Sequence, residues 1–412
     1  MPFVLADRAS YGDGQYYSLG YSLQTGGQSW EGLRNSITRV MSSNLFGIPM
    51  AGAHLCDLSN MADEELCIRW LQVGAFFPYL ESGFTSSPNN QAFPNLNANF
   101  LSALNASISL RYSILKHIYA VILQSNGSGS IFKPMFYEFP SDSVLYDSNE
   151  SFNDEQFMLG SALLVAPICY QGTESMTRYF PRTTWYDFVT GERVSNGSEK
   201  SGHFQVSSKL NSTAPLFLRG GYIVPSQSVS GINSSQGLPN SYDLRIGIKD
   251  TGNNSYQARG MLIGVNNLAD SELTYSRCVA SKCLIDVSLN GNNENLILKF
   301  KAENHAMLEE FHIRSLIFYG LSSNKQALNI SINSGPHQKI EVVRGEFNKI
   351  TLLINTTLKA DAEITIFHGE KKSVEKVEYT DSSIGNPQIS LDFVPEDSSQ
   401  TASSVKDGNV AS

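Results

Sequence analysis

A chain of 412 residues with 41% hydrophobic and 17% charged content is long enough for about two or three globular domains. Its formal net charge of −9 at pH 7 argues against nucleic acid or an anionic membrane surface as the main partner. No apolar run approaches the roughly 20 residues of a membrane-spanning helix. We also expect no signal peptide here, because the residues after Met1 lack a basic stretch followed by an apolar one.

Residues 1–131 alternate between strand-like and helix-like patterns. Short apolar runs predict strands at residues 3–6, 48–55 and 75–80. Apolar residues at helical spacing predict helices at residues 29–41, 64–74 and 99–124. This alternation is typical of parallel βα units, and the segment holds about three of them, whereas a complete (β/α)8 barrel needs eight. A partial barrel would leave strand edges unpaired.

After residue 131 the pattern becomes that of short β-strands. Apolar runs predict strands at residues 157–168, 178–181, 184–187 and 216–225, and again at 242–248, 296–300, 316–319, 350–354 and 362–367. The second group, within residues 236–372, fits a β-sandwich. Residues 373–412 are polar and rich in Ser, so we expect a disordered tail there.

Nine Asn-x-Ser/Thr sequences are a modest excess for a chain of this composition, and they favour a glycoprotein. Asn105 lies inside a predicted helix and is interpreted as a chance match. The predicted glycosylation sites are Asn126, Asn149, Asn196, Asn211, Asn233, Asn253, Asn329 and Asn355.

The most informative stretch is GYSLQTGGQSW, from Gly20 to Trp30, which a predicted helix and then FGIPMAGAHLC at residues 46–56 follow. This context resembles glycoside hydrolase family 31, the α-glucosidases of the lysosomal acid maltase and sucrase-isomaltase type. The family pattern is Gly-His-Trp-x-Gly-Asp-x-x-x-x-Trp, in which the Asp is the general acid/base. Counted from Gly20 or from Trp30, the position of that Asp falls on Thr25.

The resemblance runs from Phe3 to Pro225 and implies a fold. Residues 1–131 would be the C-terminal part of a (β/α)8 TIM barrel, and residues 132–235 a proximal β-sandwich. Residues 236–372, where the resemblance is weak, would be a distal β-sandwich. The expected fold class is therefore α/β plus all-β.

The catalytic carboxylates of the family are not matched. A retaining glycosidase uses two carboxyl groups roughly 5 Å apart, a nucleophile and an acid/base. The family nucleophile belongs to a Trp-x-Asp-Met-Asn-Glu stretch on an earlier barrel strand, and no such stretch occurs in the 412 residues. Loss of a general acid costs about 10²–10⁴-fold in rate. With Thr25 at the acid/base position and no nucleophile stretch, we predict that this chain has no catalytic residue of its own.

Other sugar-binding positions of the family have changed as well. The Asp of its Gly-Ala-Asp-x-Cys-Gly-Phe stretch becomes His54, and its Arg-Asn-His becomes Glu81-Ser82-Gly83. Arg8 matches the family's Arg and is predicted to contact substrate, although a structural ion pair is the alternative. Asp57 follows a predicted strand and could reach a pocket mouth. Substrate binding is thus predicted for Arg8, His54 and Asp57. No metal site and no cofactor are predicted, because no second His or Cys stands at ligand spacing.

Positions that build the scaffold follow the family, in contrast to the site positions. These are Glu65, Leu66, Cys67, Arg69, Trp70, Gln72, Gly74, Phe76 and Pro78. The resemblance also implies a disulfide between Cys56 and Cys67, with two buried thiols as the alternative. Cys278 and Cys283 could close a tight hairpin loop.

Three functions remain open from the sequence. The first is an α-glucosidase-like homologue that no longer hydrolyses glycosides. The second is a fragment of an active secreted α-glucosidase in which Asp13 or Asp57 has an unusual role. The third is a non-catalytic carbohydrate-binding or structural glycoprotein. The expected ligand is an α-glucoside or another carbohydrate, and the expected location is secreted, lysosomal or elsewhere in the secretory pathway; the sequence does not identify protein partners.

Overall fold

The computed structural model describes residues 5–6, 18–21, 28–56, 63–82, 97–125, 129–146, 152–194, 201–228, 241–252, 255–263, 284–292, 295–302, 310–321, 327–359 and 361–367. The tail predicted at residues 373–412 lies outside them. The domain boundaries expected after residues 131, 235 and 372 stay predictions. In the described part of the chain, no helix has both the length and the hydropathy that crossing a membrane requires.

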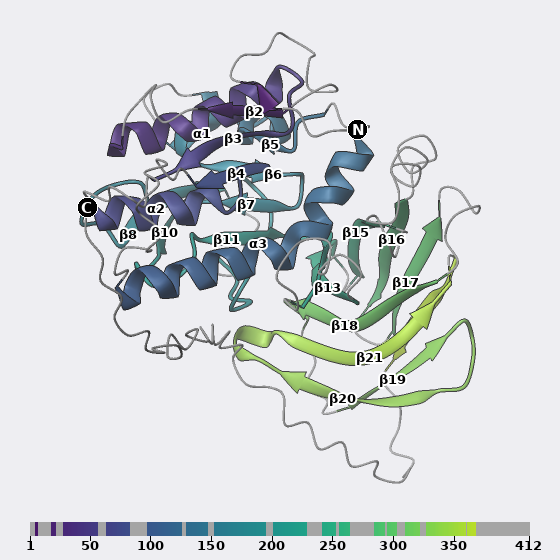
Figure 1. Ribbon diagram of the computed structural model, residues 1–412. Coiled ribbons are helices and arrows are strands. Elements are labelled where there is room, and N and C mark those ends of the chain that lie inside the picture. Colours follow the sequence, from purple (N-terminus) through teal and green to yellow (C-terminus); the bar gives the residue numbers. More distant parts are fainter. Residues whose placement is uncertain are drawn as a thin grey trace, which may run out of the picture. The chain divides into compact units, whose positions relative to one another are not determined.

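Strands and helices alternate at the start of the chain, as expected for parallel βα units (Figure 1). Within the described residues, four parallel strands form a sheet in the order of the chain: β1 (Leu5–Ala6), β2 (Ser18–Tyr21), β3 (Ala51–Leu55) and β4 (Tyr79–Ser82). Helices follow the last three strands: α1 (Trp30–Leu45), α2 (Glu64–Gly74) and α3 (Ala98–Gln124).

Each of these helices begins at a side chain that accepts a hydrogen bond from its first turn. Ser29 Oγ accepts from the backbone N–H of Gly32 at 3.0 Å, Asp63 Oδ1 from Leu66 at 3.1 Å, and Asn97 Oδ1 from Phe100 at 2.9 Å. Ser, Asp and Asn are favoured at this position because they satisfy backbone donors that the helix leaves open. The start of each helix is therefore set by a residue that lies three positions before its hydrogen-bond donor in the sequence.

The strand predicted at residues 75–80 is only partly correct. Ala75, Phe76 and Phe77 continue the last turn of α2, since their N–H groups donate to Leu71, Val73 and Gly74, and the strand begins at Tyr79. All three are buried. A short apolar run that is buried on every side gives no periodicity by which to separate a strand from a helix end.

An antiparallel region follows α3. Among the described residues, one sheet has the order β5-β6-β7-β11-β9 and a second pairs β10 with β8. The bounds are β5 (Phe132–Lys133), β6 (Phe157–Leu159), β7 (Leu163–Val165), β8 (Ser175–Phe180), β9 (Trp185–Asp187), β10 (Gly202–Ser207) and β11 (Leu216–Arg219). Short helices lie at α4 (Met135–Glu138), η4 (Ser143–Tyr146) and α5 (Phe152–Glu155).

The last region is a single sheet of eleven strands within the described ranges, in the order β12-β13-β18-β21-β20-β19-β22-β17-β16-β15-β14. β12 also pairs with β15, so the sheet nearly closes on itself. The strands are β12 (Tyr222–Ser226), β13 (Tyr242–Gly247), β14 (Lys249–Asp250), β15 (Ser255–Ile263), β16 (Leu284–Asn292), β17 (Asn295–Ala302), β18 (Phe311–Tyr319), β19 (Ala327–Ile332), β20 (Gln338–Arg344), β21 (Ile350–Leu358) and β22 (Glu363–Phe367). A 3-10 turn, η5 (Glu346–Asn348), precedes β21.

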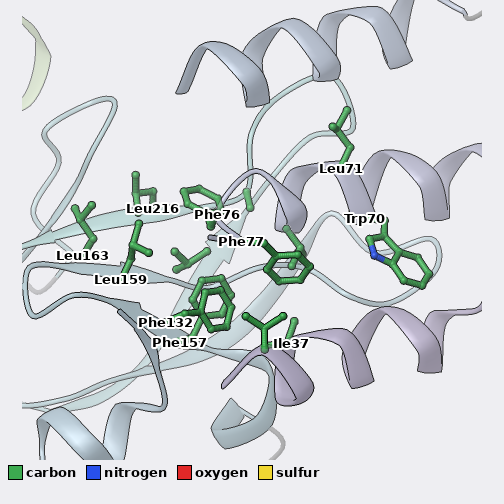
Figure 2. Close-up of a cluster of buried hydrophobic side chains, with 14 of the residues drawn as sticks. Ile37, Trp70, Leu71, Phe76, Phe77, Phe132, Phe157, Leu159, Leu163 and Leu216 are labelled. Atoms are coloured by element: carbon green, nitrogen blue, oxygen red, sulfur yellow. The ribbon is translucent and has the colours of Figure 1, made fainter. Parts of the chain in front are cut away.

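One hydrophobic core joins the parallel sheet and its helices to the first antiparallel sheet. Figure 2 shows its centre, where the rings of Phe132 and Phe157 stack with centroids 3.9 Å apart. Phe77, at the end of α2, meets Phe132 edge-on at 5.6 Å. A separate core fills the eleven-stranded sheet. The first two regions therefore cannot be pulled apart without exposing aromatic surface to water.

A buried polar network ties α2 to the antiparallel region. Arg69 is fully buried, and its Nη1 donates to the carbonyl oxygen of Ser208 at 3.0 Å and its Nη2 to that of Thr173 at 2.8 Å. Gln72 Oε1 accepts from Arg69 at 3.0 Å, and Gln72 Nε2 donates to the carbonyl of Ser212 at 2.7 Å. Arg69 Nε is buried without a partner in the described part of the chain. The bonds to Ser208, Thr173 and Ser212 link residues more than 100 positions apart in the sequence.

Two further side chains act in the same way. Asn44 Oδ1, near the end of α1, accepts from the N–H groups of Ile131 and Phe132, both at 3.0 Å. Arg111, on α3, donates to the carbonyls of Ala75 at 2.9 Å and Pro78 at 3.1 Å. The buried turns between elements thus have their backbone groups satisfied by long polar side chains.

Arg69→Ala is expected to lower the free energy of unfolding by about 3 kcal/mol or more, because two buried carbonyls lose their donor and a cavity remains. The midpoint of urea unfolding measures the change. Arg182, an exposed residue, is the matched control, and Arg182→Ala should change stability by less than about 0.5 kcal/mol. Equal effects of the two substitutions would contradict the role given to Arg69.

His117 on α3 should make stability depend on pH. It is buried, its Nε2 lies 3.3 Å from the carbonyl oxygen of Leu159, and burial lowers its pKa from 6.5 to about 4. Between these two pH values the unfolded state binds more protons than the folded state. The free energy of unfolding contributed by His117 therefore falls as the pH is lowered from 6.5 to 4.

His117→Gln keeps a donor for Leu159 but cannot take up the proton. The variant should lose part of the pH dependence between pH 4 and 6.5, by up to about 1.4 kcal/mol per pH unit. Urea unfolding at a series of pH values measures both slopes. His203→Gln makes the same exchange at an exposed position and should leave the wild-type slope unchanged. If the slope of His117→Gln also equals that of the wild type, the buried histidine is not the group responsible.

Candidate functional site

Three of the predicted site positions follow strands of the parallel sheet in the sequence. Strands that run parallel end at the same edge of their sheet, and in α/β proteins the ligand site forms at the carboxyl ends of the strands. Arg8 follows β1, Thr25 follows β2 and Asp57 follows β3 in the sequence. All three lie outside the described residues, so their roles stay predictions. The described structure fixes the strand ends from which these segments leave.

His54 is the one predicted site residue on a described strand. The register of β3 and β4 pairs His54 with Glu81 and Leu55 with Ser82. The two strands approach closely, since a Cβ added at Gly52 would lie 1.8 Å from the carbonyl oxygen of Tyr79. The resemblance gives Asp and Arg at the two positions where this chain has His54 and Glu81. The register shows that these two substitutions fall on paired positions.

Glu81 is a carboxylate at this edge that the sequence pattern did not single out. Tyr79 and Glu81 alternate along β4, and the Tyr79 hydroxyl donates to Glu81 Oε2 at 2.6 Å. Burial, together with the neighbouring carboxylate, raises the pKa of Tyr79 to about 12, which keeps this hydroxyl a donor at neutral pH. A polar pair two residues apart at a strand end was the signal that could have found it, because such residues share one face.

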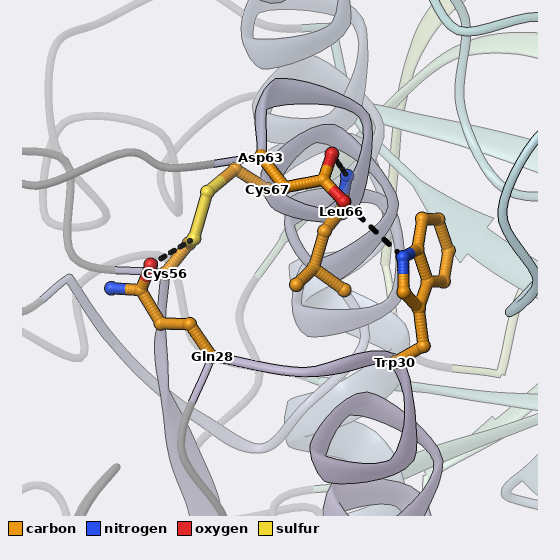
Figure 3. The surroundings of a disulfide bond; sticks show 6 residues. All are labelled: Gln28, Trp30, Cys56, Asp63, Leu66 and Cys67. Carbon is orange, nitrogen blue, oxygen red and sulfur yellow. Dashed lines mark hydrogen bonds between the residues drawn. A yellow bond between two sulfur atoms is a disulfide. The ribbon is translucent and has the colours of Figure 1, made fainter.

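Figure 3 shows how the segments around Thr25 and Asp57 are anchored at their ends. A disulfide joins Cys56, just after β3, to Cys67 on α2, with the Cα atoms 5.2 Å apart. This confirms the predicted bridge. Gln28 Oε1 lies 3.4 Å from Cys56 Sγ, and Trp30 Nε1 donates to Asp63 Oδ2 at 3.2 Å. The described residues before and after 57–62, and those after 22–27, are therefore linked to one another by these contacts.

The described residues of this edge do not assemble a catalytic centre. Asp63 is engaged with Trp30 and Leu66, and Glu81 with Tyr79. No group of three or more His, Cys, Asp and Glu that could hold a metal ion occurs within the described ranges. The buried thiol of Cys169 is no nucleophile either, since burial raises its pKa to about 12. Among the described residues, this edge carries one hydrogen-bonded carboxylate–hydroxyl pair, Glu81 with Tyr79.

Four of the Asn-x-Ser/Thr positions fall on described residues, the helical Asn105 included. Asn211 is exposed in a turn, Asn329 lies on β19 and Asn355 on β21, and Asn105 lies on α3. Asn126, Asn149, Asn196, Asn233 and Asn253 lie outside the described residues, as do Cys278 and Cys283. Modification of any of these asparagines stays a prediction.

Two protein-family models match the chain. The model for the glycosyl hydrolases family 31 TIM-barrel domain matches residues 1–121, and the model for the glycosyl hydrolase family 31 C-terminal domain matches residues 128–224. Together they span the parallel sheet, its helices and the antiparallel region. They confirm the predicted fold class, in which the end of a TIM barrel is followed by β-sandwich domains.

Curated relatives agree with these models. The chain is 31% identical over 337 residues to the lysosomal acid alpha-glucosidase of Tetrahymena pyriformis, covering 77% of this chain and 36% of that protein. It is 32% identical over 244 residues to the lysosomal alpha-glucosidase of Mus musculus, covering 56% and 25%. The chain therefore spans only a minor part of the length of these relatives.

Solved structures show the same fold. The glucosidase II alpha subunit bound to alpha3-Glc2 matches with a TM-score of 0.70 and 20% identity over 89% of this chain and 39% of that chain. A dextranase of Flavobacterium johnsoniae complexed with glucose matches with a TM-score of 0.59 and 20% identity, over 86% and 44%. At this identity the likeness concerns the fold alone.

The disulfide should stabilise the frame around the pocket segments. Cys56 and Cys67 are separated by 11 positions, and closing a loop of this size restricts the unfolded chain enough to contribute about 3 kcal/mol. Cys56→Ser/Cys67→Ser is expected to lower the melting temperature of the non-reduced protein. A reductant should lower the wild-type melting temperature to that of the variant.

The double variant under reductant is the control for this measurement. A further drop there would come from other cysteines, with Cys278 and Cys283 as candidates. The bridge would not contribute to stability if the reductant did not change the wild-type melting temperature and the double variant melted at the same temperature as the wild type.

Proposed function

The chain belongs to glycosyl hydrolase family 31, and we propose that it is an α-glucosidase-like homologue that does not hydrolyse glycosidic bonds with its own residues. Thr25 at the position of the family's acid/base carries this proposal. A threonine hydroxyl does not give up its proton near neutral pH, so it cannot protonate the leaving group. The family mechanism needs a carboxylic acid of raised pKa for that step.

The missing nucleophile stretch supports the same conclusion for this chain. No Trp-x-Asp-Met-Asn-Glu stretch occurs in the 412 residues, and without a nucleophile no covalent glycosyl intermediate forms. We assign neither role to Glu81, whose Oε2 accepts a hydrogen bond from the Tyr79 hydroxyl at 2.6 Å.

Carbohydrate binding without hydrolysis is the function that we assign to the site. Three contacts of the described scaffold support this assignment: the Cys56–Cys67 bridge, the Trp30–Asp63 bond and the buried Arg69 network. An α-glucoside or another neutral sugar is the proposed ligand, contacted by Arg8, His54 and Asp57. The glucosidase II alpha subunit has been solved with the binding domain of a regulatory subunit, and a subunit role is compatible with the same proposal. The lysosomal relatives support a place in the secretory pathway.

A second function is favoured by the partial coverage of the relatives. The chain spans 36% of the Tetrahymena pyriformis protein, so it could be one part of a larger α-glucosidase that supplies the nucleophile elsewhere. Thr25 would still require another acid, and Asp13 and Asp57 are the residues proposed for it. Hydrolysis would then belong to the larger protein and not to these 412 residues alone.

The purified chain is expected to release no glucose from maltose and no chromophore from 4-nitrophenyl α-glucoside between pH 4 and 7, beyond a heat-denatured sample. A family 31 α-glucosidase assayed in parallel is the positive control. Glucose or an iminosugar should nevertheless raise the melting temperature, because a ligand that binds only the folded state stabilises it. Hydrolysis above the denatured control would overturn the proposal, and absence of any shift at millimolar ligand would favour a structural role.

Thr25→Asp tests the loss of the acid/base separately from the loss of the nucleophile. In this chain the substitution should restore no activity, since the nucleophile stretch is still lacking. Activity of the Thr25→Asp variant would show that the chain contains a working nucleophile, and the acid would then be its only defect. Under the second function only the larger protein hydrolyses α-glucosides, and Asp57→Asn should abolish that activity there.

A further inference from the structure

A cleft of about 410 Å³ lies away from the carboxyl ends of the parallel strands. The turn between β11 and β12 forms one side and β14, β15 and β16 form the other, with Thr183 beside them. We propose that this cleft binds the anionic group of a small phosphate or sulfate ester. This proposal does not depend on the function of the strand-end site, because it rests on different residues.

The charge of the cleft is opposite to that of the chain. Arg219, Lys249 and Arg259 line it, and none of the described lining residues is Asp or Glu. The whole chain carries a net charge of −9. Like charges on neighbouring side chains repel, and a bound anion relieves that repulsion while it accepts their hydrogen bonds. Three cations around one hollow of an acidic protein therefore point to an anionic ligand.

An ion pair with Glu138 restrains the side chain of Arg219. Its Nη1 donates to Glu138 Oε1 at 2.7 Å, and Glu138 Oε2 accepts from Lys133 at 2.8 Å and from Ser161 at 3.0 Å. Burial alone would raise the pKa of Glu138, but Lys133 and Arg219 outweigh it and keep that pKa below its usual value. Lys133 thus compensates much of the Glu138 charge. Both hydrogen bonds of Arg219 in the described structure use Nη1, so its other donors are not committed to protein groups there.

Both guanidinium groups lie over the ring of Tyr222. Arg219 lies over its ring at 5.0 Å from the centroid and Arg259 at 5.7 Å. The turn that sets Arg219 and Tyr222 next to the cleft contains Gly221 at φ +86°, a conformation that side chains rarely adopt. Rigid cations lose less conformational entropy on binding than mobile ones.

A neighbouring cleft of about 370 Å³ could hold the rest of the ligand. It shares Tyr222, Arg259 and Ser288 with the first, and its walls include Val121, Ile223 and Met261. Asp286 also lines this second cleft and disfavours another anionic group there. The pair of clefts fits a molecule with one tetrahedral anion and an uncharged body.

Calorimetric titration at constant ionic strength tests the proposal, with inorganic phosphate as the first probe. Phosphate should bind, glucose 6-phosphate and glucose 6-sulfate should bind more tightly, and added chloride should weaken all three. The two esters distinguish a phosphate from a sulfate preference. Glucose serves as the uncharged probe, and its binding should not respond to substitutions in the cleft.

Lys249→Gln and Arg259→Gln remove one cation each from exposed positions of the cleft, where loss of folding is not expected. Each should weaken phosphate binding by about tenfold or more, because a charge-assisted hydrogen bond is lost. Lys339→Gln makes the same change of charge on β20, which does not line either cleft, and should leave binding unchanged. No phosphate binding, or equal binding by all three variants and the wild type, would overturn the proposal.

Discussion

The buried guanidinium of Arg69 on α2 links the parallel sheet and its helices to the antiparallel sheets that follow them in the chain. Arg69 lies with its charge among backbone carbonyls that come from residues more than 100 positions later. A charge in such a place is unfavourable unless every nearby acceptor is aimed at it. Together with Gln72 and the stacked rings of Phe132 and Phe157, it fixes where α2 lies. Through Cys67, α2 also bears the disulfide to Cys56, which directly follows β3.

The chain therefore separates the residues that hold the fold from those that would carry chemistry. Long-range stabilising contacts among the described residues are made by α2, by the end of α1 at Asn44 and by Arg111 on α3. A fold of this family can keep its architecture after its catalytic groups have changed, because function belongs to the site and not to the scaffold.

Local physics made much of the fold predictable. The helices were visible from apolar periodicity, and the structure adds Ser29, Asp63 and Asn97 as the residues whose side chains begin them. The Cys56–Cys67 bridge came only from the family resemblance, because spacing alone does not choose a partner. The strand expected from residue 75 begins only at Tyr79, since a fully buried apolar run has no period that separates a strand from a helix end. The pairing of His54 with Glu81 and the cluster of Arg219 with Arg259 join residues distant in the sequence. Such contacts depend on strand register and sheet order, which no local pattern encodes.

The order of the eleven-stranded sheet has a consequence for how the protein is made. β22, the last described strand, lies between β19 and β17 in the interior of the sheet and pairs with both. Until a ribosome has released residues 363–367, β17 and β19 each have an open edge, and the core between them is accessible to water and to other nascent chains. Open strand edges recruit foreign strands, and contacts of such long sequence separation form slowly. Synthesis of this region should therefore depend on chaperones up to its final strand, and a premature stop a few codons earlier would yield a sheet with a gap in its middle.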